Sequence, residues 1–248
     1  MRLTPPRSLA SQDWPALTNE RRAALKDSGL EIVGELSVNK VFLEPGFSGV
    51  EGGMTIIFEG RSNAVYLGRR QRFHGPIKFD GDDSVVELAG GDGLVRLGAT
   101  IYSAGRLAVG PDCVFFGVVA WVHGGARLTV GENCLFSEPV HFRTSDHHSI
   151  IDLKTMQPVN FPADIQIGAH VWIGPGVTVN KGVSIGDGSI VGAGSLVTKP
   201  IPDRELWVGV PARRLRQNVS WVGSLPAIRE HIDDLVQRFD LTARAEYP

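Results

Sequence analysis

The chain has 248 residues, of which 42% are apolar, so it can bury one substantial core or two smaller ones. Its 25 Lys and Arg residues nearly balance its 27 Asp and Glu residues, which argues against nucleic acid or an anionic membrane surface as the partner. No stretch approaches the roughly 18 apolar residues of a membrane span, and the N-terminus lacks the apolar region of a signal peptide. We therefore expect a cytoplasmic protein with a small, nearly neutral partner.

Residues 1–30 are predicted to form an N-terminal helical segment. Asp13 has the place of an N-cap, Pro15 falls in the first turn, and Gly29 follows the expected end of the helix. This helix is expected to cap the domain that follows or to pack on a neighbour. Residues 31–60 show irregular strand-like patterns that follow no clear period.

A six-residue period dominates the second half of the chain. From Ile167 the sequence divides into IGAHVW, IGPGVT, VNKGVS, IGDGSI, VGAGSL and VTKPIP, each opened by an aliphatic residue that Gly or another small residue usually follows. The fifth positions are small or β-branched, which suits a tight strand position that faces inward. Neither a helical period of 3.6 nor a simple alternating strand predicts six such units in phase.

The same phase is predicted to extend towards the N-terminus, with Gly91 and Ser103 as weak members and one shift of three residues. The unit-opening residues on this interpretation are Leu67, Phe73, Phe79, Val85, Leu97, Val109, Phe115 and Trp121, then Val130, Phe136 and Phe142. From Phe142 to Ile167 the distance exceeds three units by seven residues, which predicts an inserted loop at 144–166. Cys113 and Cys134 fall at fifth positions and lack metal-ligand spacing, so we expect reduced, buried thiols.

These repeats resemble those of the hexapeptide-repeat acyltransferases. The resemblance implies an all-β fold, a left-handed parallel β-helix with three six-residue strands per coil. The left hand runs against the general rule for parallel crossovers and follows only from the resemblance. Each coil is expected to stack its aliphatic residues on those of its neighbours over residues 31–215.

A C-terminal segment, residues 216–248, follows the predicted β-helix. Apolar residues recur there at spacings of three and four, which predicts an amphipathic helix over 225–240. They are Leu225, Ile228, Ile232, Leu235, Val236 and Phe239. The helix is expected to cover the last coil or to contact another subunit.

The inserted loop carries the sequence RTSDHHSIIDLKTMQPVN, and a loop of this length in a compact domain is often functional. Together with the later Val-Trp-Ile-Gly unit it resembles the O-acetyltransferases of surface polysaccharides and related sugars. The matching residues are Ser145, Asp146, His148, Ser149 and Ile150, then Val171, Trp172, Ile173 and Gly174. The resemblance makes His148 the catalytic histidine and leaves His147 at a variable position. The broader sugar O-acetyltransferase pattern, which sets its histidine at a fixed distance before the Trp, selects the same residue.

A sugar hydroxyl is a poor nucleophile at neutral pH, so its transfer chemistry needs a general base. An imidazole can take the hydroxyl proton during attack and pass it to the departing thiolate. His148 is the candidate, with His147 as a weaker one, and Asp146 either orients the imidazole or holds the loop as an Asx turn. A metal site formed by Asp146, His147 and His148 is disfavoured because adjacent side chains on extended backbone diverge.

The resemblance further implies acetyl-CoA as co-substrate, bound in a groove between the subunits of a homotrimer, and no metal. Trp172 is expected to wall the active site, with a subunit contact as the alternative. The other residues carried over as donor-binding candidates are Gly174, Pro175, Ala193, Thr198, Lys199, Arg213 and Arg216. The two arginines and Lys199 offer cations for phosphates, although a solvated basic turn is the other interpretation of the arginines. The chain departs from the family at Val210 and Pro200, neither of which replaces a candidate side chain.

The sequence thus predicts an acetyl-CoA-dependent O-acetyltransferase that acts by direct transfer on a sugar hydroxyl of a polysaccharide or its precursor. An N- or O-acetyltransferase of an amino sugar or antibiotic is the alternative within the class. A γ-type carbonic anhydrase is remote, because two of its zinc ligands lie five residues apart and the histidines at 74, 123, 141, 147, 148, 170 and 231 include no such pair. A purely structural β-helix needs neither the loop nor the VTK and GVPAR motifs.

Overall fold

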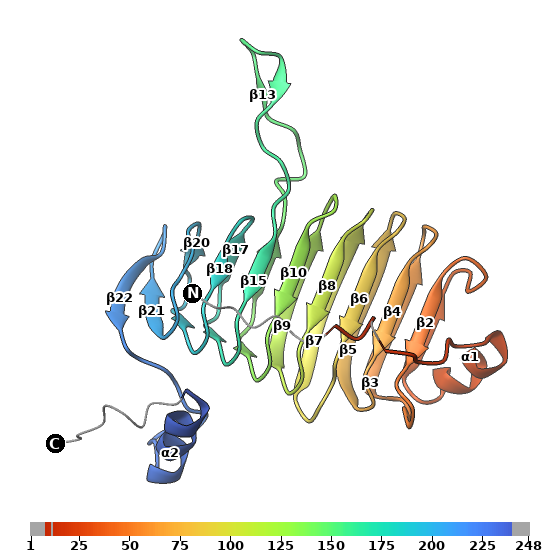
Figure 1. The fold of residues 1–248 in the computed structure, drawn as a ribbon, viewed down its shortest axis with the longest axis horizontal. Coiled ribbons are helices and arrows are strands. Elements are labelled where there is room, and N and C mark those ends of the chain that lie inside the picture. Colours follow the sequence, from red (N-terminus) through yellow and green to blue (C-terminus); the bar gives the residue numbers. More distant parts are fainter. Residues whose placement is uncertain (1–7, 11, 240–248) are drawn as a thin grey trace.

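The structure is a computed structural model that describes residues 8–10 and 12–239. The chain winds as a parallel β-helix whose coils stack in sequence order, as Figure 1 shows. Its described residues form two α-helices, α1 (Asn19–Lys26) near the N-terminus and α2 (Arg229–Arg238) near the C-terminus. The prediction of an all-β parallel β-helix with a short helix near each end is confirmed.

Three flat faces surround the core in the later coils. The first face consists of β11 (Leu135–Phe136), β16 (Trp172–Ile173), β19 (Ile190–Val191) and β21 (Glu205–Val208). The second consists of β12 (Val140–Arg143), β17 (Val177–Asn180) and β20 (Leu196–Val197). The third is a seven-stranded sheet of β2 (Lys40–Leu43), β4 (Ala64–Leu67), β6 (Val85–Leu88), β8 (Arg106–Val109), β10 (Arg127–Val130), β15 (Ile165–Ile167) and β18 (Ser184–Ile185).

In the earlier coils one long strand supplies both the first and the second face. These coils contain β1 (Leu30–Val33), β3 (Val50–Phe58), β5 (Gln71–Asp80), β7 (Leu94–Tyr102) and β9 (Val114–Val122). The start of β9 pairs with β11 and its end pairs with β12. Each long strand therefore continues around the corner between the first and second faces, where the later coils have a loop. The remaining strands are the hairpin β13 (Ile151–Asp152) and β14 (Gln157–Pro158), and β22 (Arg213–Gln217), which runs antiparallel to β21.

The coil length changes along the chain, and this corrects the predicted phase. Leu67 pairs with Leu88, which pairs with Val109, whereas Ile167 pairs with Ile185, so each earlier coil is longer than a later one by three residues. The six-residue phase is therefore wrong for the earlier coils. Strand side chains alternate with a period of two, and six is a multiple of two, so stretches of each long strand match the phase by alternation alone.

The core is a column of stacked inward side chains. Val171, Ile173, Val177 and Val179 are all fully buried, as the six-residue pattern predicts for the later coils. In the centre, Phe115 stacks on Phe136 with 4.4 Å between ring centroids. The free thiols of Cys113 and Cys134 are buried and donate to the carbonyls of Gly131 and Gly168, so the prediction of buried thiols is confirmed.

The N-terminal helix starts later than predicted. Helix α1 begins at Asn19 rather than after Asp13, and no side chain caps it. The reason is that the preceding segment pairs with a strand of the third face: Ala16 bridges Phe42, and the Leu17 N–H donates to the Val41 carbonyl. Gly29 does follow the helix, with φ of +82°.

The C-terminal helix α2 is shorter than the predicted 225–240, since Leu225 and Ile228 lie before it and are exposed. No side chain of α2 is fully buried.

The corrected phase predicts opposite outcomes for two adjacent valines. Val86 is fully buried, whereas its neighbour Val85 points outward. We expect Val86→Asp to lower stability by at least about 3 kcal/mol, and the melting temperature by about 6 to 12 °C, because it buries an unpaired carboxylate. Val85→Asp should stay within about 0.5 kcal/mol of the unchanged protein, as surface substitutions usually do. Thermal unfolding followed by circular dichroism measures both, and a larger effect at Val85 would restore the strict six-residue phase.

Candidate active site

A long excursion leaves the coil between β12 and β15. Its neck is closed by the Ala163 N–H, which donates to the Thr144 carbonyl at 2.9 Å, and its tip is the β13–β14 hairpin. Figure 1 shows this arm, residues 144–164, projecting away from the stacked coils. It leaves at the edge between the second and third faces, where the neighbouring coil turns at Lys181. The arm therefore begins where the sequence motif of the candidate base lies.

Asp146 ties the base of the arm to the next coil. Its carboxylate accepts hydrogen bonds from the ammonium group of Lys181 and from Asn160 Nδ2, the latter at 2.7 Å. The Lys181 hydrogen bond, followed by that of Asn160, lowers the pKa of Asp146 below its usual range. Asn160 also donates to the His148 carbonyl at 2.8 Å. These contacts tie the loop to the neighbouring coil, and none of them joins the Asp146 carboxylate to the imidazole of His148.

His147 faces the body of the β-helix. Its Nδ1 lies 3.1 Å from His123 Nε2, and its ring meets Tyr102 and Trp121 edge-on, with centroids 5.9 and 5.7 Å away. Its backbone has φ of +63°, the left-handed region that a β-carbon disfavours, and its N–H donates to Ser145 Oγ. The contacts of His147 thus hold the turn that carries both histidines in a strained conformation.

His148 is exposed like His147 but makes different contacts. Only its backbone is bound: its N–H donates to the Asp146 carbonyl at 2.8 Å and its carbonyl accepts from Asn160. Within residues 8–10 and 12–239, no hydrogen bond or ring contact occupies its imidazole. This imidazole is fixed at its backbone and open at both ring nitrogens, the arrangement that a general base for an incoming hydroxyl requires.

An aromatic cluster lies beside the arm on the second face. It consists of Tyr102, Trp121, His123, His141 and His147. Tyr102 stacks on His123 with 3.7 Å between centroids, and Trp121 stacks on His141 at 6.1 Å. Burial, and then the charge of His147, lower the pKa of His123 to about 4. The six-residue phase does not predict this cluster, because Tyr102 and His123 lie on successive coils. Their separation equals the length of an earlier coil, so the correct coil length would have placed them together.

The donor-binding candidates lie on two different edges. Gly174, Pro175 and Ala193 stack at the edge between the first and second faces, where the Gly194 N–H donates to the Pro175 carbonyl at 2.8 Å. A β-carbon on Gly174 would come within 2.9 Å of the Ala193 nitrogen, so the coils meet closely here. Thr198 and Lys199 are exposed at the edge that carries the arm, one coil beyond Lys181.

Both candidate arginines follow the last coil. Arg213 and Arg216 belong to the exposed strand β22, and Arg213 Nη1 donates to the Ala212 carbonyl at 3.0 Å. No carboxylate pairs with either of them among the described residues. Both guanidinium groups are therefore open to an anionic ligand.

Trp172 begins β16 and is 37% exposed, as predicted for an outward residue. Its ring lies 6.3 Å from that of Trp221, which in turn stacks on His170 at 4.4 Å and donates to the His170 carbonyl. Burial lowers the pKa of His170. Trp172 and His148 are not brought together within the described chain. Trp172 is the first residue of a strand on the first face, whereas the arm that carries His148 leaves the coil after a strand of the second face.

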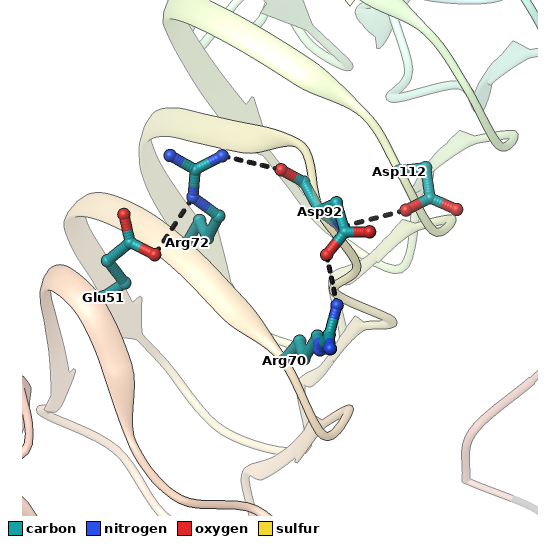
Figure 2. A network of polar contacts seen from close by, with 5 residues as sticks. All are labelled: Glu51, Arg70, Arg72, Asp92 and Asp112. Atoms are coloured by element: carbon teal, nitrogen blue, oxygen red, sulfur yellow. Dashed lines mark hydrogen bonds and ion pairs between the residues drawn. The ribbon is translucent and has the colours of Figure 1, made fainter.

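A hollow in the surface lies at the N-terminal coils, away from the arm, and contains none of the predicted site residues. Its volume is about 780 Å³, and it is lined by polar and charged groups that include Arg70, Arg72 and Asp92. Figure 2 shows how these groups pair with one another: Arg70 with the Asp92 carboxylate at 2.5 Å, and Arg72 with Glu51 at 3.1 Å and with the Asp92 carbonyl at 2.8 Å. Because Arg70, Arg72, Glu51 and Asp92 pair with one another, the charges drawn in Figure 2 are engaged within this hollow.

In the part of the chain that the structure describes, no group of three or more His, Cys, Asp or Glu side chains is arranged to hold a metal ion. None of the described helices has the length and apolar character needed to cross a bilayer.

Comparisons with known proteins bear on the repeats and on the fold. Residues 164–199 match the family model described as bacterial transferase hexapeptide (six repeats), which confirms the resemblance of the repeats to that family. Comparison with curated protein sequences gives no match. Among solved structures, the polysialic acid-specific acetyltransferase NeuO has a TM-score of 0.71 at 23% identity, over 87% of this chain and 95% of that one. The polysialic acid O-acetyltransferase OatWY has a TM-score of 0.70 at 22% identity, over 85% and 99%. At these identities the likeness shows a shared fold.

The lowered pKa of His123 predicts a pH-dependent loss of stability. The unfolded chain takes up a proton on this residue near pH 6.5 and the native chain only near pH 4, so the native state loses stability as the pH falls between these values. We expect His123→Phe, which keeps an aromatic ring on Tyr102, to lose less stability than the unchanged protein between pH 7 and pH 4.5. Melting temperatures across this range measure the difference, and identical slopes would show that His123 titrates normally in the folded protein.

Proposed function

We propose that this chain, which carries the repeats and the β-helix fold of the hexapeptide transferases, is an acetyl-CoA-dependent O-acetyltransferase that modifies a sugar hydroxyl of a polysaccharide or its precursor. The observation that carries the proposal is His148, an imidazole without a partner in the described chain, presented by an arm that interrupts a transferase repeat. The loop motif around it resembles that of the polysaccharide O-acetyltransferases.

His148 acts as general base in a direct transfer. The acceptor hydroxyl loses its proton to the imidazole while its oxygen forms a bond to the acetyl carbon, and the carbon–sulfur bond of the thioester breaks. The imidazolium then returns the proton to the departing thiolate, so the histidine ends the cycle neutral. Asp146 and Asn160 hold the backbone on either side of His148 and fix where the imidazole is presented.

The donor lies along the second face, between the two edges that carry its motifs. The edge at Pro175 and Ala193 admits the pantetheine arm, because both residues are exposed and carry short side chains, while the buried Gly174 lets the two coils meet closely beneath them. Thr198 and Lys199 lie at the edge of the arm and face the reacting end or a phosphate. Arg213 and Arg216 offer further cations for phosphates at the last coil.

The active site is completed in a homotrimer, between neighbouring copies. Two observations support this arrangement. Trp172 and His148 do not meet in one chain, and the arm exposes large apolar side chains that a monomer leaves in water. Leu153 is 83% exposed, Met156 68% and Phe161 66%. Apolar groups gathered on one projecting segment indicate a contact with another molecule. We propose that this molecule is a second copy of the chain, whose Trp172 completes the site at the arm.

The acceptor we propose first is an acidic polysaccharide such as polysialic acid, in place of the small, nearly neutral partner expected from the charge balance, because the two structural neighbours described above are acetyltransferases of polysialic acid. Thiol release from acetyl-CoA, measured against a panel of polysaccharides, amino sugars and antibiotics, tests this. If no acceptor raises the rate above hydrolysis of acetyl-CoA, the proposed function fails.

The two adjacent histidines should respond differently to substitution. We expect His148→Ala to lose at least about 10²-fold in acetyl-transfer rate, the usual contribution of a general base, and His147→Ala to stay within about tenfold because it supports the turn without reaching the substrate. Thiol release at saturating acetyl-CoA measures both. The reverse ranking would make His147 the base.

A mixing experiment tests whether the site is shared. His148→Ala and Trp172→Ala are each expected to be inactive trimers. Refolding them together at equal amounts should restore about a quarter of the unchanged activity, because one interface in four then receives an intact His148 from one copy and an intact Trp172 from the next. Size-exclusion chromatography with light scattering checks the trimer. No recovery in mixed trimers would place both residues in the site of a single chain.

A further inference from the structure

We propose that Arg143 binds a carboxylate of the acceptor sugar, from a platform formed by Trp121, and so selects acidic glycans. The inference rests on the proposed function, since it assigns the acceptor side of the same site. It makes Arg143 a specificity-determining residue and Trp121 its support.

The register of the coils places these two residues on one another. Arg143 ends β12 and points outward on the second face, and its neighbours in register are Trp121 on the preceding coil and Asn180 on the following one. The guanidinium carbon lies 4.7 Å from the centroid of the Trp121 ring. The guanidinium thus rests on the indole of the preceding coil.

Stacking of this kind prepares a guanidinium for a carboxylate. The cation uses its flat face on the indole, and its N–H donors stay in the plane of the group, where they match the two oxygens of a carboxylate. Because the side chain is already held, less conformational entropy is lost when an anion binds. Arg143 is a cation positioned for an oxyanion.

Arg143 is also free of a carboxylate in the part of the chain that the structure describes. Two lysines near it are already paired: Lys78 with Glu59 at 2.9 Å, and Lys181 with Asp146. Lys199 lies two coils further along the same edge and is assigned to the donor. Arg143 is therefore the cation beside the aromatic cluster with spare hydrogen-bonding capacity.

The surroundings suit a sugar ring. The Trp121 ring runs parallel to that of His141, with 7° between their planes, and Tyr102 stacks on His123 one column away. Flat rings with polar edges, lying partly exposed on one face, offer the C–H face of a pyranose a surface to pack on and its hydroxyls hydrogen-bonding groups at the rim.

The site is next to the proposed base. Arg143 is the last residue before the arm, five positions ahead of His148, and the outward column continues through Asn180 to Thr198 of the donor motif. Successive coils are about 4.8 Å apart, so Arg143 and Thr198 are separated by about 10 Å along the column. A carboxylate held at Arg143 therefore leaves the same sugar residue, or the next one along the polymer, beside His148.

The experiment compares acidic polymers with their neutral counterparts. Polysialic acid and polygalacturonate are each used intact and after reduction of their carboxylates to alcohols. For the unchanged protein, Arg143→Gln, Arg143→Lys and the control Arg106→Gln, we measure acetyl transfer with each polymer and, separately, polymer binding without acetyl-CoA by tryptophan fluorescence and calorimetry. Arg106 is an exposed arginine at the start of β8 on the third face, so its substitution makes the same charge change away from the cluster.

We expect Arg143→Gln to raise KM for the acidic polymer by about tenfold or more, the scale of a lost charge-assisted hydrogen bond, with kcat within about threefold and KM for acetyl-CoA unchanged. Reduced polymers should bind the unchanged protein and Arg143→Gln equally weakly. Arg143→Lys should recover part of the affinity, and Arg106→Gln should behave as the unchanged protein.

Three outcomes would overturn the inference: equal losses on intact and reduced polymers, no loss in Arg143→Gln, or no binding of either acidic polymer to the unchanged protein. Binding of an acidic polymer that depends on Arg143, without any acetyl transfer, would leave the inference standing and remove the proposed function.

Discussion

The parallel stacking of each coil on the next is the constraint on which the rest of the structure depends. Backbone N–H groups of one coil donate to carbonyls of its neighbour, as Gly174 does to Val191 at 2.8 Å and Thr178 to Ser195 at 3.0 Å. Stacking fixes the register, so every outward side chain stands directly over another at about 4.8 Å. This converts a one-dimensional sequence period into columns of side chains on three faces. The arm, the aromatic cluster and the donor motifs are each positioned by their place in such columns.

The later coils could be predicted from the sequence, and the earlier ones only in part. In the shorter, later coils, inward residues such as Ile173 and Ile185 recur in phase with the six-residue period, and the pattern identifies the fold. In the longer, earlier coils, alternation within long strands imitates the same period while the corners move. Trp121 illustrates the consequence, because the six-residue phase places it inward and the structure turns it outward beneath Arg143.

The candidate site likewise contains residues that a sequence motif predicts and contacts that arise only from the register of the coils. The loop motif makes both His148 and Asp146 candidates, because they belong to one continuous stretch of sequence. The partners of Asp146 were not visible, since Lys181 belongs to the next coil and Asn160 to the returning strand of the arm. His123 and His147 are likewise distant in the chain and meet only because of the coil and the excursion. Contacts across coils need the register, which a single sequence does not contain.

The two adjacent histidines have different environments for one geometric reason. A left-handed residue at His147 reverses the chain, so its ring turns back onto Tyr102 and Trp121, while the ring of His148 contacts no other ring in the described part of the chain. The same aromatic cluster that receives His147 supports Arg143. The position of the proposed base and the position of the proposed carboxylate site are therefore set by one set of rings, and a change in the packing of Trp121 displaces both together. Acceptor binding and base placement are therefore coupled through Trp121, although Arg143 itself binds only the acceptor in this proposal.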